Sequence, residues 1–333
     1  MGQLVEGVWQ DTNTREVNRD GQFVRNASPF RNWVTIDGSP GPTGQGGFKT
    51  EAGRYHLYVS YACPWAHRTL LYRSLLGLED VIDISVVHPV NMENGWVFDG
   101  YLGATPDRIG GARFMHEVYT RAEPGYSGKV TVPVLWDRAT DGIVNNESAD
   151  IIRMLGGPAF RGLARTWVDF LPADKLDEID EINDYVYRTI NNGVYRTGFA
   201  QSQQAYETGV AEMFEAFGVL DERLRDRRFL HGDQLLESDL RLFTTMIRFE
   251  PVYYFHFKCN VRLLSDYPNL RRHTRDILNL NGVRGTVFLD HIVDHYYLAH
   301  RRINPYGIIP AGASVDLDGP DWGPDEGQEI AAC

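Results

Sequence analysis

Cysteine is scarce in this chain, and long apolar runs are missing. The 333 residues include only Cys63, Cys259 and Cys333, an odd and sparse set that is typical of reducing compartments and not of disulfide-stabilised secreted domains. No stretch approaches the ~18 consecutive apolar residues of a membrane span, and residues 1–21 show no apolar run of a signal peptide. We therefore expect a cytoplasmic protein with no membrane partner.

The chain also has fewer positively charged than negatively charged side chains. The chain has 33 Lys and Arg against 45 Asp and Glu, for a formal net charge of −12, which argues against a nucleic-acid partner because phosphate binding needs a basic surface. The motifs G-x-S-x-G and G-x-x-x-x-G-K-[ST] are absent, and Gly110 and Gly111 follow no strand pattern, so they indicate a turn rather than a dinucleotide loop.

Length and apolar content predict more than one folded core. A chain of 333 residues that is 43% hydrophobic exceeds a typical domain of roughly 100–200 residues. Shifts in composition and in the spacing of apolar residues suggest an arm with little regular structure, a first domain, an all-helical second domain after a Gly- and Pro-containing linker, and a tail; the boundaries are 1–50, 51–157, 172–310 and 311–333.

The first domain is predicted to alternate strands and helices. Residues 55–61 and 81–87 have the composition of strands, and the helix between them would make them parallel neighbours. Residues 88–129 form a long excursion between predicted strands, and their apolar residues show no strong periodic spacing. Residues 131–137 and 143–145 then predict two further strands, and 149–155 a helix. This order is that of a thioredoxin-like domain.

Pro133 lies inside the strand predicted for 131–137. Proline cannot donate a hydrogen bond to a sheet, so it requires an edge position or a cis turn. An ordinary edge-strand proline is the alternative. The cysteine-proline pair upstream favours a cis peptide bond beside a reactive cysteine.

Cys63 directly precedes Pro64, which suits the first position of a helix running to about Gly77. The unpaired N–H groups and positive end of that helix would favour a thiolate; the alternative is a buried cysteine that acts as a small hydrophobe. Ala66 stands where a C-x-x-C motif would have its second cysteine. Any disulfide of Cys63 must therefore form with a small thiol or another chain.

The second domain has the apolar spacing of helices throughout. Five helices are predicted, at 176–190, 206–224, 239–249, 267–278 and 285–301. The third is apolar nearly all round, so we expect it to be buried. His291 and His295 are spaced as two metal ligands on a helix could be, but the stretch lacks the Glu of the H-E-x-x-H motif, and no cluster of Cys or Asp accompanies it. We expect a surface or domain-contact role for them and no metal.

Three stretches together resemble the xi class of glutathione transferases, whose members are glutathionyl-hydroquinone reductases. They are YACPWAHR, TVPVLWD and NNESADIIRML, at 61–68, 131–137 and 145–155. The resemblance implies a thioredoxin-like domain followed by an all-α domain, glutathione as co-substrate, and a homodimer. It also implies that the Cys63 thiolate attacks the sulfur of a glutathionyl-hydroquinone, forms a mixed disulfide with glutathione, and is restored by a second glutathione.

The resemblance assigns catalytic roles to three tyrosines. Tyr195 matches the residue that supplies a proton to the carbon of the leaving hydroquinone. Tyr253 and Tyr296 match residues that flank the cysteine and lower its pKa. Judged from the residues alone, Tyr254 and Tyr297 are equally plausible.

Glutathione offers an extended backbone and charged ends. Its peptide can pair with the backbone at Val132, and the helix start at Glu147 and Ser148 can hold the γ-glutamyl carboxylate and ammonium groups. A plain helix cap is the alternative for this pair. The resemblance places the glycyl end at Trp96 and Lys129, where Lys replaces a more usual Arg, and adds Val130, Thr131 and Pro133 to the binding residues.

Two other functions remain open from the sequence. The Cys-Pro-x-Ala motif also occurs in omega-like thiol transferases and dehydroascorbate reductases, and the fold could serve a non-catalytic interaction protein. The physiological quinone is not determined by the sequence.

Overall fold

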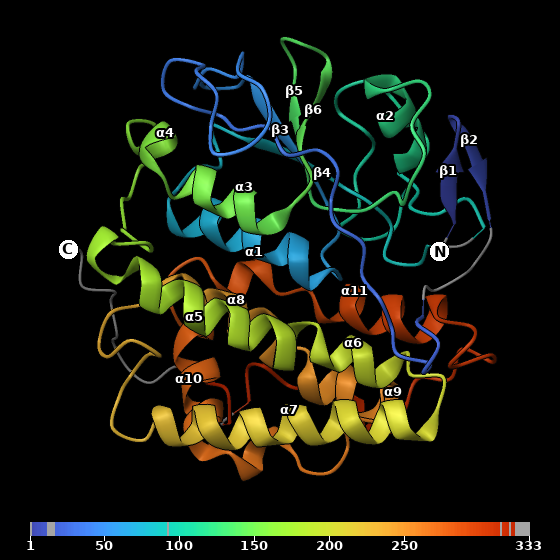
Figure 1. Cartoon of the computed structure of the whole chain (residues 1–333), viewed down its shortest axis with the longest axis vertical. Helices are drawn as coiled ribbons and strands as arrows, with labels where there is room; N and C mark the ends of the chain where they lie inside the picture. The colour runs from blue at the N-terminus through green and yellow to red at the C-terminus, as the bar shows by residue number, and fades with distance from the viewer. Residues whose placement is uncertain (1, 12–16, 92, 314, 320, 324–333) are drawn as a thin grey trace. The chain divides into compact units, whose positions relative to one another are not determined.

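The structure is a computed structural model, and it describes residues 2–11, 17–91, 93–313, 315–319 and 321–323 (Figure 1). Contacts within the chain divide it into two compact units. The first unit comprises Met1–Thr14, Asn26–Val168 and Asp290–His295. The second unit comprises Arg15–Arg25, Asp169–Leu289 and Tyr296–Cys333.

A four-stranded sheet forms the centre of the first unit. Its strands are β3 (Tyr55–Val59), β4 (Asp83–Val86), β5 (Val134–Asp137) and β6 (Gly142–Asn145). They lie in the order β4-β3-β5-β6, with β4 parallel to β3 and the other pairs antiparallel. Every residue of β3 and β5 is buried, as expected for a sheet with both faces covered. The thioredoxin-like order predicted from the sequence is confirmed.

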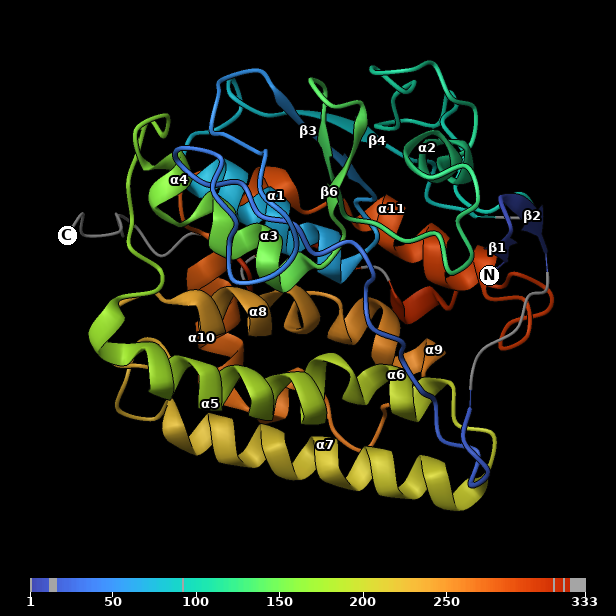
Figure 2. The ribbon, with the colours of Figure 1, turned by 45° about the horizontal axis from the view of Figure 1, so that its top comes forward.

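Two helices that position functional residues pack together in this unit. Helix α1 (Pro64–Leu75) joins β3 to β4, and α3 (Ser148–Leu155) follows β6. The two helices are in contact and lie side by side in both views (Figures 1 and 2). The N-terminus of each helix therefore follows a strand of the same sheet.

The peptide bond between Val132 and Pro133 is cis, as predicted. The strand predicted for 131–137 begins only at Val134. Pro133 has no N–H group to donate to the sheet, so the regular ladder starts after it.

The excursion over 88–129 contains a helix that the sequence analysis missed. Helix α2 (Met115–Ala122) buries Met115, Val118 and Tyr119, but eight residues are too few for a clear period. The turn predicted at Gly110 and Gly111 is present. The Asp107 carboxylate accepts hydrogen bonds from the backbone N–H groups of residues 109, 110 and 112 at 2.8–3.0 Å.

The N-terminal arm has more regular structure than expected. Strands β1 (Gln3–Val5) and β2 (Val8–Gln10) form an antiparallel hairpin. Glu6 and Gly7 turn the chain between them with φ values of 49° and 77°. Further along, Asn32 N–H donates to the carbonyl of Val144 at 3.0 Å, which joins the arm to the edge of β6.

The second unit is helical, and its described residues contain no strand. Its α-helices are α5 (Leu176–Val186), α6 (Gly193–Gly198), α7 (Gln203–Arg223), α8 (Glu237–Met246), α9 (Tyr254–His256) and α10 (Pro268–Leu278). Every residue of α8 is buried, as expected for the helix predicted at 239–249, although most residues of α8 are polar. The all-α character expected after the linker is confirmed.

Three five-residue π-helices lie at the end of, directly after or within predicted helices, namely those at 176–190, 239–249 and 285–301. These are Tyr187–Asn191, Phe249–Tyr253 and His295–Ala299. The helix predicted for 285–301 is instead a 3₁₀ turn at Arg284–Thr286, then α11 (Leu289–Asp294), then the last of these π-helices. Apolar spacing does not reveal such changes, because a π turn adds a residue without breaking the helical run.

The start of α8 is organised by the buried carboxylate of Asp239. It accepts hydrogen bonds from the N–H groups of Leu230 at 2.8 Å and Leu236 at 2.9 Å. His273 Nε2 of α10 lies 2.8 Å from the same carboxylate. The Leu236 side chain has no acceptor, so only one half of a capping box can form. Asp239 thus joins a loop, α8 and α10.

Replacing Asp239 with Asn should destabilise the second unit. An amide offers one acceptor where the carboxylate offers two, so a buried donor loses its partner at a cost of about 1–3 kcal/mol. Urea unfolding followed by circular dichroism would measure the change. The matched variant Asp184→Asn, on the exposed face of α5, should unfold like the wild type. Equal unfolding of both variants would contradict the role given to Asp239.

Candidate active site

Cys63 is the N-cap residue of α1, and Pro64 occupies the first helical position. Its side chain is partly buried, and Sγ lies 3.5 Å from the carbonyl oxygen of Val132. The first turn of α1 contains no acidic residue, so nothing there opposes the positive end of the helix. Ala66, at the position of a second cysteine, is fully buried. The cysteine therefore has the helix-start position predicted for it.

Arg68 brings a buried positive charge to the same end of α1. Its side chain is 2% exposed, and its Cζ atom lies 4.5 Å from the ring centroid of Trp65. Nη1 donates to the Ser148 hydroxyl at 3.4 Å, so Arg68 connects the starts of α1 and α3. Because the guanidinium group is buried, its positive potential is less screened by solvent.

The backbone before the cis bond is held by Tyr119, which the sequence analysis did not identify. Its hydroxyl donates to the Thr131 carbonyl at 2.9 Å and accepts from Asn146 Nδ2 at 3.1 Å. Val130 and Val132 are buried on either side of Thr131. Pro133 is also buried, and Lys129 is half-buried. The backbone of this segment is thus held in place beside Cys63.

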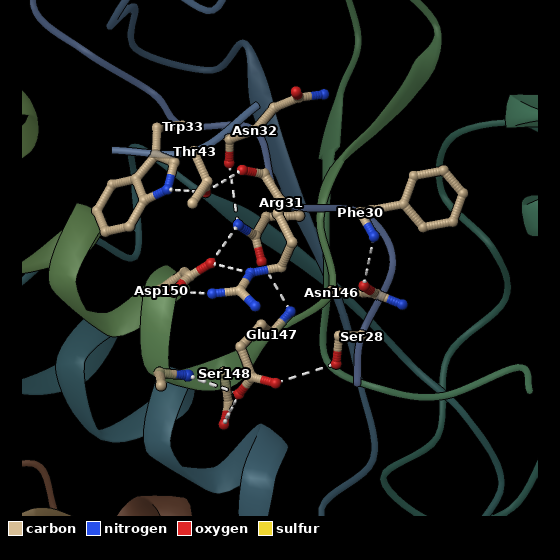
Figure 3. A network of polar contacts seen from close by, with 12 residues as sticks. Ser28, Phe30, Arg31, Asn32, Trp33, Thr43, Asn146, Glu147, Ser148 and Asp150 are labelled. Atoms are coloured by element: carbon tan, nitrogen blue, oxygen red, sulfur yellow. Dashed lines mark hydrogen bonds and ion pairs between the residues drawn. The ribbon is translucent and has the colours of Figure 1, made fainter. Parts of the chain in front are cut away.

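Glu147 and Ser148 lie at the start of α3, as predicted. Glu147 is the N-cap residue, and its Oε1 accepts from the N–H of Ala149 at 3.1 Å. Its Oε2 accepts from the Ser28 hydroxyl at 3.0 Å (Figure 3). Ser148 is the first helical residue and is buried. The alternative of a helix cap therefore holds for Glu147, while its contact with glutathione stays a prediction.

A second polar network holds the first turn of α3 to the arm. Arg31 forms an ion pair with Asp150 through two nitrogens, and its Nη2 lies 2.9 Å from Oδ1 (Figure 3). Asn145 Nδ2 donates to the other Asp150 oxygen at 3.1 Å and to the Asn32 carbonyl at 3.0 Å. The arm thus fixes the helix start that carries Glu147.

Trp96 is buried in the first unit and stacks on His295. Their ring centroids are 5.0 Å apart with an interplanar angle of 18°. His295 Nδ1 lies 2.7 Å from the carbonyl oxygen of Pro89, and His291 Nε2 lies 2.6 Å from that of Leu102. These two histidines therefore fasten α11 to the excursion that carries Trp96.

Of the two roles expected for His291 and His295, a surface or a domain-contact role, the surface role is wrong, because they are only 2% and 9% exposed. Burial lowers the pKa of His291, which favours its neutral form. The described residues include no group of three or more His, Cys, Asp or Glu side chains that could hold a metal ion.

Three tyrosine hydroxyls form a chain within the second unit. The hydroxyl of Tyr296 lies 2.6 Å from that of Tyr195 and 3.0 Å from that of Tyr253. These are the three residues that the family resemblance selected. Tyr297 instead donates to the Pro251 carbonyl at 3.0 Å, and the ring of Tyr254 packs on Phe255. The structure therefore brings the selected tyrosines together and leaves their neighbours outside the chain.

Burial raises the pKa of both Tyr253 and Tyr296 well above the ordinary value of 10. Both are fully protonated at neutral pH and can donate hydrogen bonds. Tyr253 ends one π-helix, Tyr296 is the second residue of another, and Tyr195 follows the third in α6. Single π turns are frequent at functional sites, and here they accompany every member of the hydroxyl chain.

The other two cysteines differ from Cys63. Cys259 is fully buried, and burial raises the pKa of its thiol, which disfavours a reactive thiolate. Cys333, expected to be incidental, lies outside the described residues.

Comparisons with known proteins agree with these features. The family model of the glutathione S-transferase N-terminal domain matches residues 62–157, and that of the C-terminal domain matches residues 203–276. The glutathionyl-hydroquinone reductase YqjG of Escherichia coli is 52% identical over 321 residues, which cover 96% of this chain and 98% of YqjG.

Solved structures extend the similarity to the fold. The glutathione-bound structure of Escherichia coli YqjG superposes with a TM-score of 0.88 at 50% identity, covering 96% of this chain and 98% of that one. The xi glutathione transferase of Phanerochaete chrysosporium gives a TM-score of 0.84 at 46% identity, covering 91% and 96% of the two chains. With a cysteine at the start of its first long helix and similarity over nearly its whole length, the chain belongs to the xi class of the glutathione transferase superfamily.

Proposed function

We propose that this protein is a glutathionyl-hydroquinone reductase that uses Cys63 as its nucleophile. The observation that best supports this proposal is the position of Cys63. It is the N-cap residue of α1, and its sulfur lies 3.5 Å from the Val132 carbonyl oxygen, directly before the cis proline. The reductase YqjG, 52% identical over nearly the full chain, supports the choice of substrate.

The reaction is proposed to proceed in two exchanges at sulfur. The Cys63 thiolate attacks the sulfur of the glutathionyl group, and the carbon–sulfur bond breaks as the new sulfur–sulfur bond forms. The electron pair of the broken bond remains on the aromatic carbon, which takes up a proton and leaves as part of the hydroquinone. A second glutathione thiolate then attacks the mixed disulfide, which releases oxidised glutathione and restores the Cys63 thiolate.

Tyr195 is the proposed donor of the proton to carbon. When it loses its proton, its oxygen can accept a hydrogen bond from the Tyr296 hydroxyl at 2.6 Å. Tyr296 can in turn accept one from Tyr253 at 3.0 Å. Because burial keeps both of these phenols protonated, the chain can stabilise a developing negative charge on Tyr195 without losing protons itself.

Glutathione is proposed to bind along the backbone that precedes Pro133, beside Cys63. The described residues provide no hydrogen-bond partner for the N–H of Val132, which suits pairing with a peptide backbone. Ser148 and the start of α3 would hold the γ-glutamyl carboxylate, and Glu147 the ammonium group. The remaining proposed binding residues are Trp96, Lys129, Val130, Thr131 and Pro133.

A glutathione-dependent thiol transferase or dehydroascorbate reductase is the second candidate. A relative in Schizosaccharomyces pombe that is 43% identical is named an omega-like glutathione S-transferase. Exchange between sulfur atoms needs no proton on carbon, so it would not require the three-hydroxyl chain. That chain favours the hydroquinone reaction over both this candidate and a non-catalytic interaction protein.

Several broader expectations accompany the proposal. A homodimer, a cytoplasmic location, and the absence of nucleic-acid and membrane partners remain predictions, as do the domain boundaries set from the sequence. The described residues include no helix that is long and apolar enough to span a membrane.

Replacing Cys63 with Ala should abolish turnover of glutathionyl-menadione, because no other described thiol is a nucleophile at a helix start. The assay would follow hydroquinone release by chromatography with glutathione in excess. The control is Cys259→Ala, which removes a buried thiol and should retain activity in the folded fraction. Full activity of the Cys63 variant would refute the assignment.

Replacing Tyr195 with Phe should lower kcat for glutathionyl-menadione by about 10²–10⁴-fold, the usual contribution of a general acid. Reduction of a mixed disulfide of glutathione and 2-mercaptoethanol should be unaffected, since only sulfur–sulfur bonds change. Tyr297→Phe is the matched control, because its hydroxyl contacts the Pro251 carbonyl and not the chain. Equal loss with both substrates would argue against proton transfer by Tyr195.

A further inference from the structure

Residues 17–25 of the arm belong to the second unit and are fastened to the turn between α6 and α7 (Figures 1 and 2). The Gly21 carbonyl accepts from the N–H of Gln201 at 2.9 Å, and the Asp20 carbonyl accepts from the Ser202 hydroxyl at 2.8 Å. Gly21 has a φ of +79°, and a Cβ atom there would lie 3.1 Å from the Ser202 nitrogen. The segment is thus held at a fixed place on this unit.

This attachment carries Arg25 to the face of the Tyr195 ring. The Cζ atom of Arg25 lies 4.9 Å from the centroid of that ring and 5.4 Å from the centroid of Phe23. Phe23 packs in turn on Phe199 with centroids 5.5 Å apart. The guanidinium group is therefore placed by aromatic contacts on the unit that holds the hydroxyl chain.

A hydrogen bond fixes the orientation of this guanidinium group. Arg25 Nε donates to Asn192 Oδ1 at 3.0 Å. Asn192 directly follows the π-helix Tyr187–Asn191 and precedes α6, the helix of Tyr195. Asn192, which orients the guanidinium group, and Tyr195, whose ring lies beneath that group, are thus close in sequence.

A cation above an aromatic face interacts favourably with the ring, and more so when the ring carries negative charge. Tyr195 gains negative charge when its proton moves to the aromatic carbon of the substrate. The neighbouring Arg196 is different, because its guanidinium pairs with the Glu212 carboxylate at 2.7 Å.

We propose that Arg25 is a positioning residue for the proton-donating step: it orients the Tyr195 ring and stabilises the charge that the ring acquires. The inference rests on the proposed function. In this step the O–H bond of Tyr195 breaks, its proton joins the aromatic carbon that held the glutathionyl sulfur, and the phenolate is reprotonated from water before the next turnover. Arg25 gains and loses no proton.

The test is a double-mutant cycle with Arg25→Met and Tyr195→Phe in the full chain, which measures whether two residues act together. We expect Arg25→Met to lower kcat for glutathionyl-menadione by about threefold to thirtyfold, the range of cation–π effects. It should leave reduction of the glutathione–mercaptoethanol disulfide unchanged. In the Tyr195→Phe background, the same replacement should have no further effect on kcat. Arg25→Lys, which keeps the charge, should restore part of the loss.

Arg196→Met is the matched control. It removes a cation from α6, the helix of Tyr195, but leaves Arg25 on the face of the Tyr195 ring. It should keep the wild-type kcat for glutathionyl-menadione. The inference is overturned if Arg25→Met keeps wild-type kcat, lowers both activities equally, or causes the same loss in the Tyr195→Phe background. If the wild-type protein reduces only the disulfide, the proposed function fails and the inference fails with it.

Discussion

The close approach of a helix start to the backbone before a cis proline is the constraint on which the rest of the first unit depends. Cys63 must lie where α1 has unpaired N–H groups, and its sulfur must face the carbonyl of Val132. The peptide bond that follows this carbonyl is cis, and Tyr119 holds the segment before it in place. The central sheet brings these pieces together by setting β3 beside β5.

The sequence was most informative where a residue type has few structural alternatives. A proline after a cysteine allowed the start of α1 to be placed, and a proline within a strand allowed the cis bond to be predicted. The burial expected for the helix at 239–249 is also found for α8, although most residues of α8 are polar. The tyrosines are a different case, because 17 tyrosines occur in the chain and local pattern alone could not separate Tyr253 from Tyr254. Their shared hydroxyl chain depends on residues distant in sequence.

Features that depend on tertiary contacts escaped the sequence analysis. The π-helix Phe249–Tyr253 preserves a helical pattern while changing where each side chain points. Helix α2 was too short for its apolar residues to show a period. His291 and His295 resembled surface residues because histidine is polar, yet each bonds a backbone carbonyl that the linear sequence does not reveal. Nothing in the sequence distinguishes Arg25 from the other arginines, and only the fold places its guanidinium group over the Tyr195 ring.

The presence of Ala66 where a C-x-x-C motif has its second cysteine affects how the proposed catalytic cycle is completed. Because Ala66 stands at this position and is buried, α1 has no second thiol beside Cys63 that could release a captured glutathionyl group. Under the proposed function, recycling then depends on thiol supplied from solution. When that supply falls, the protein should accumulate in its glutathionylated form, and the extent of this modification would follow the redox state of its surroundings.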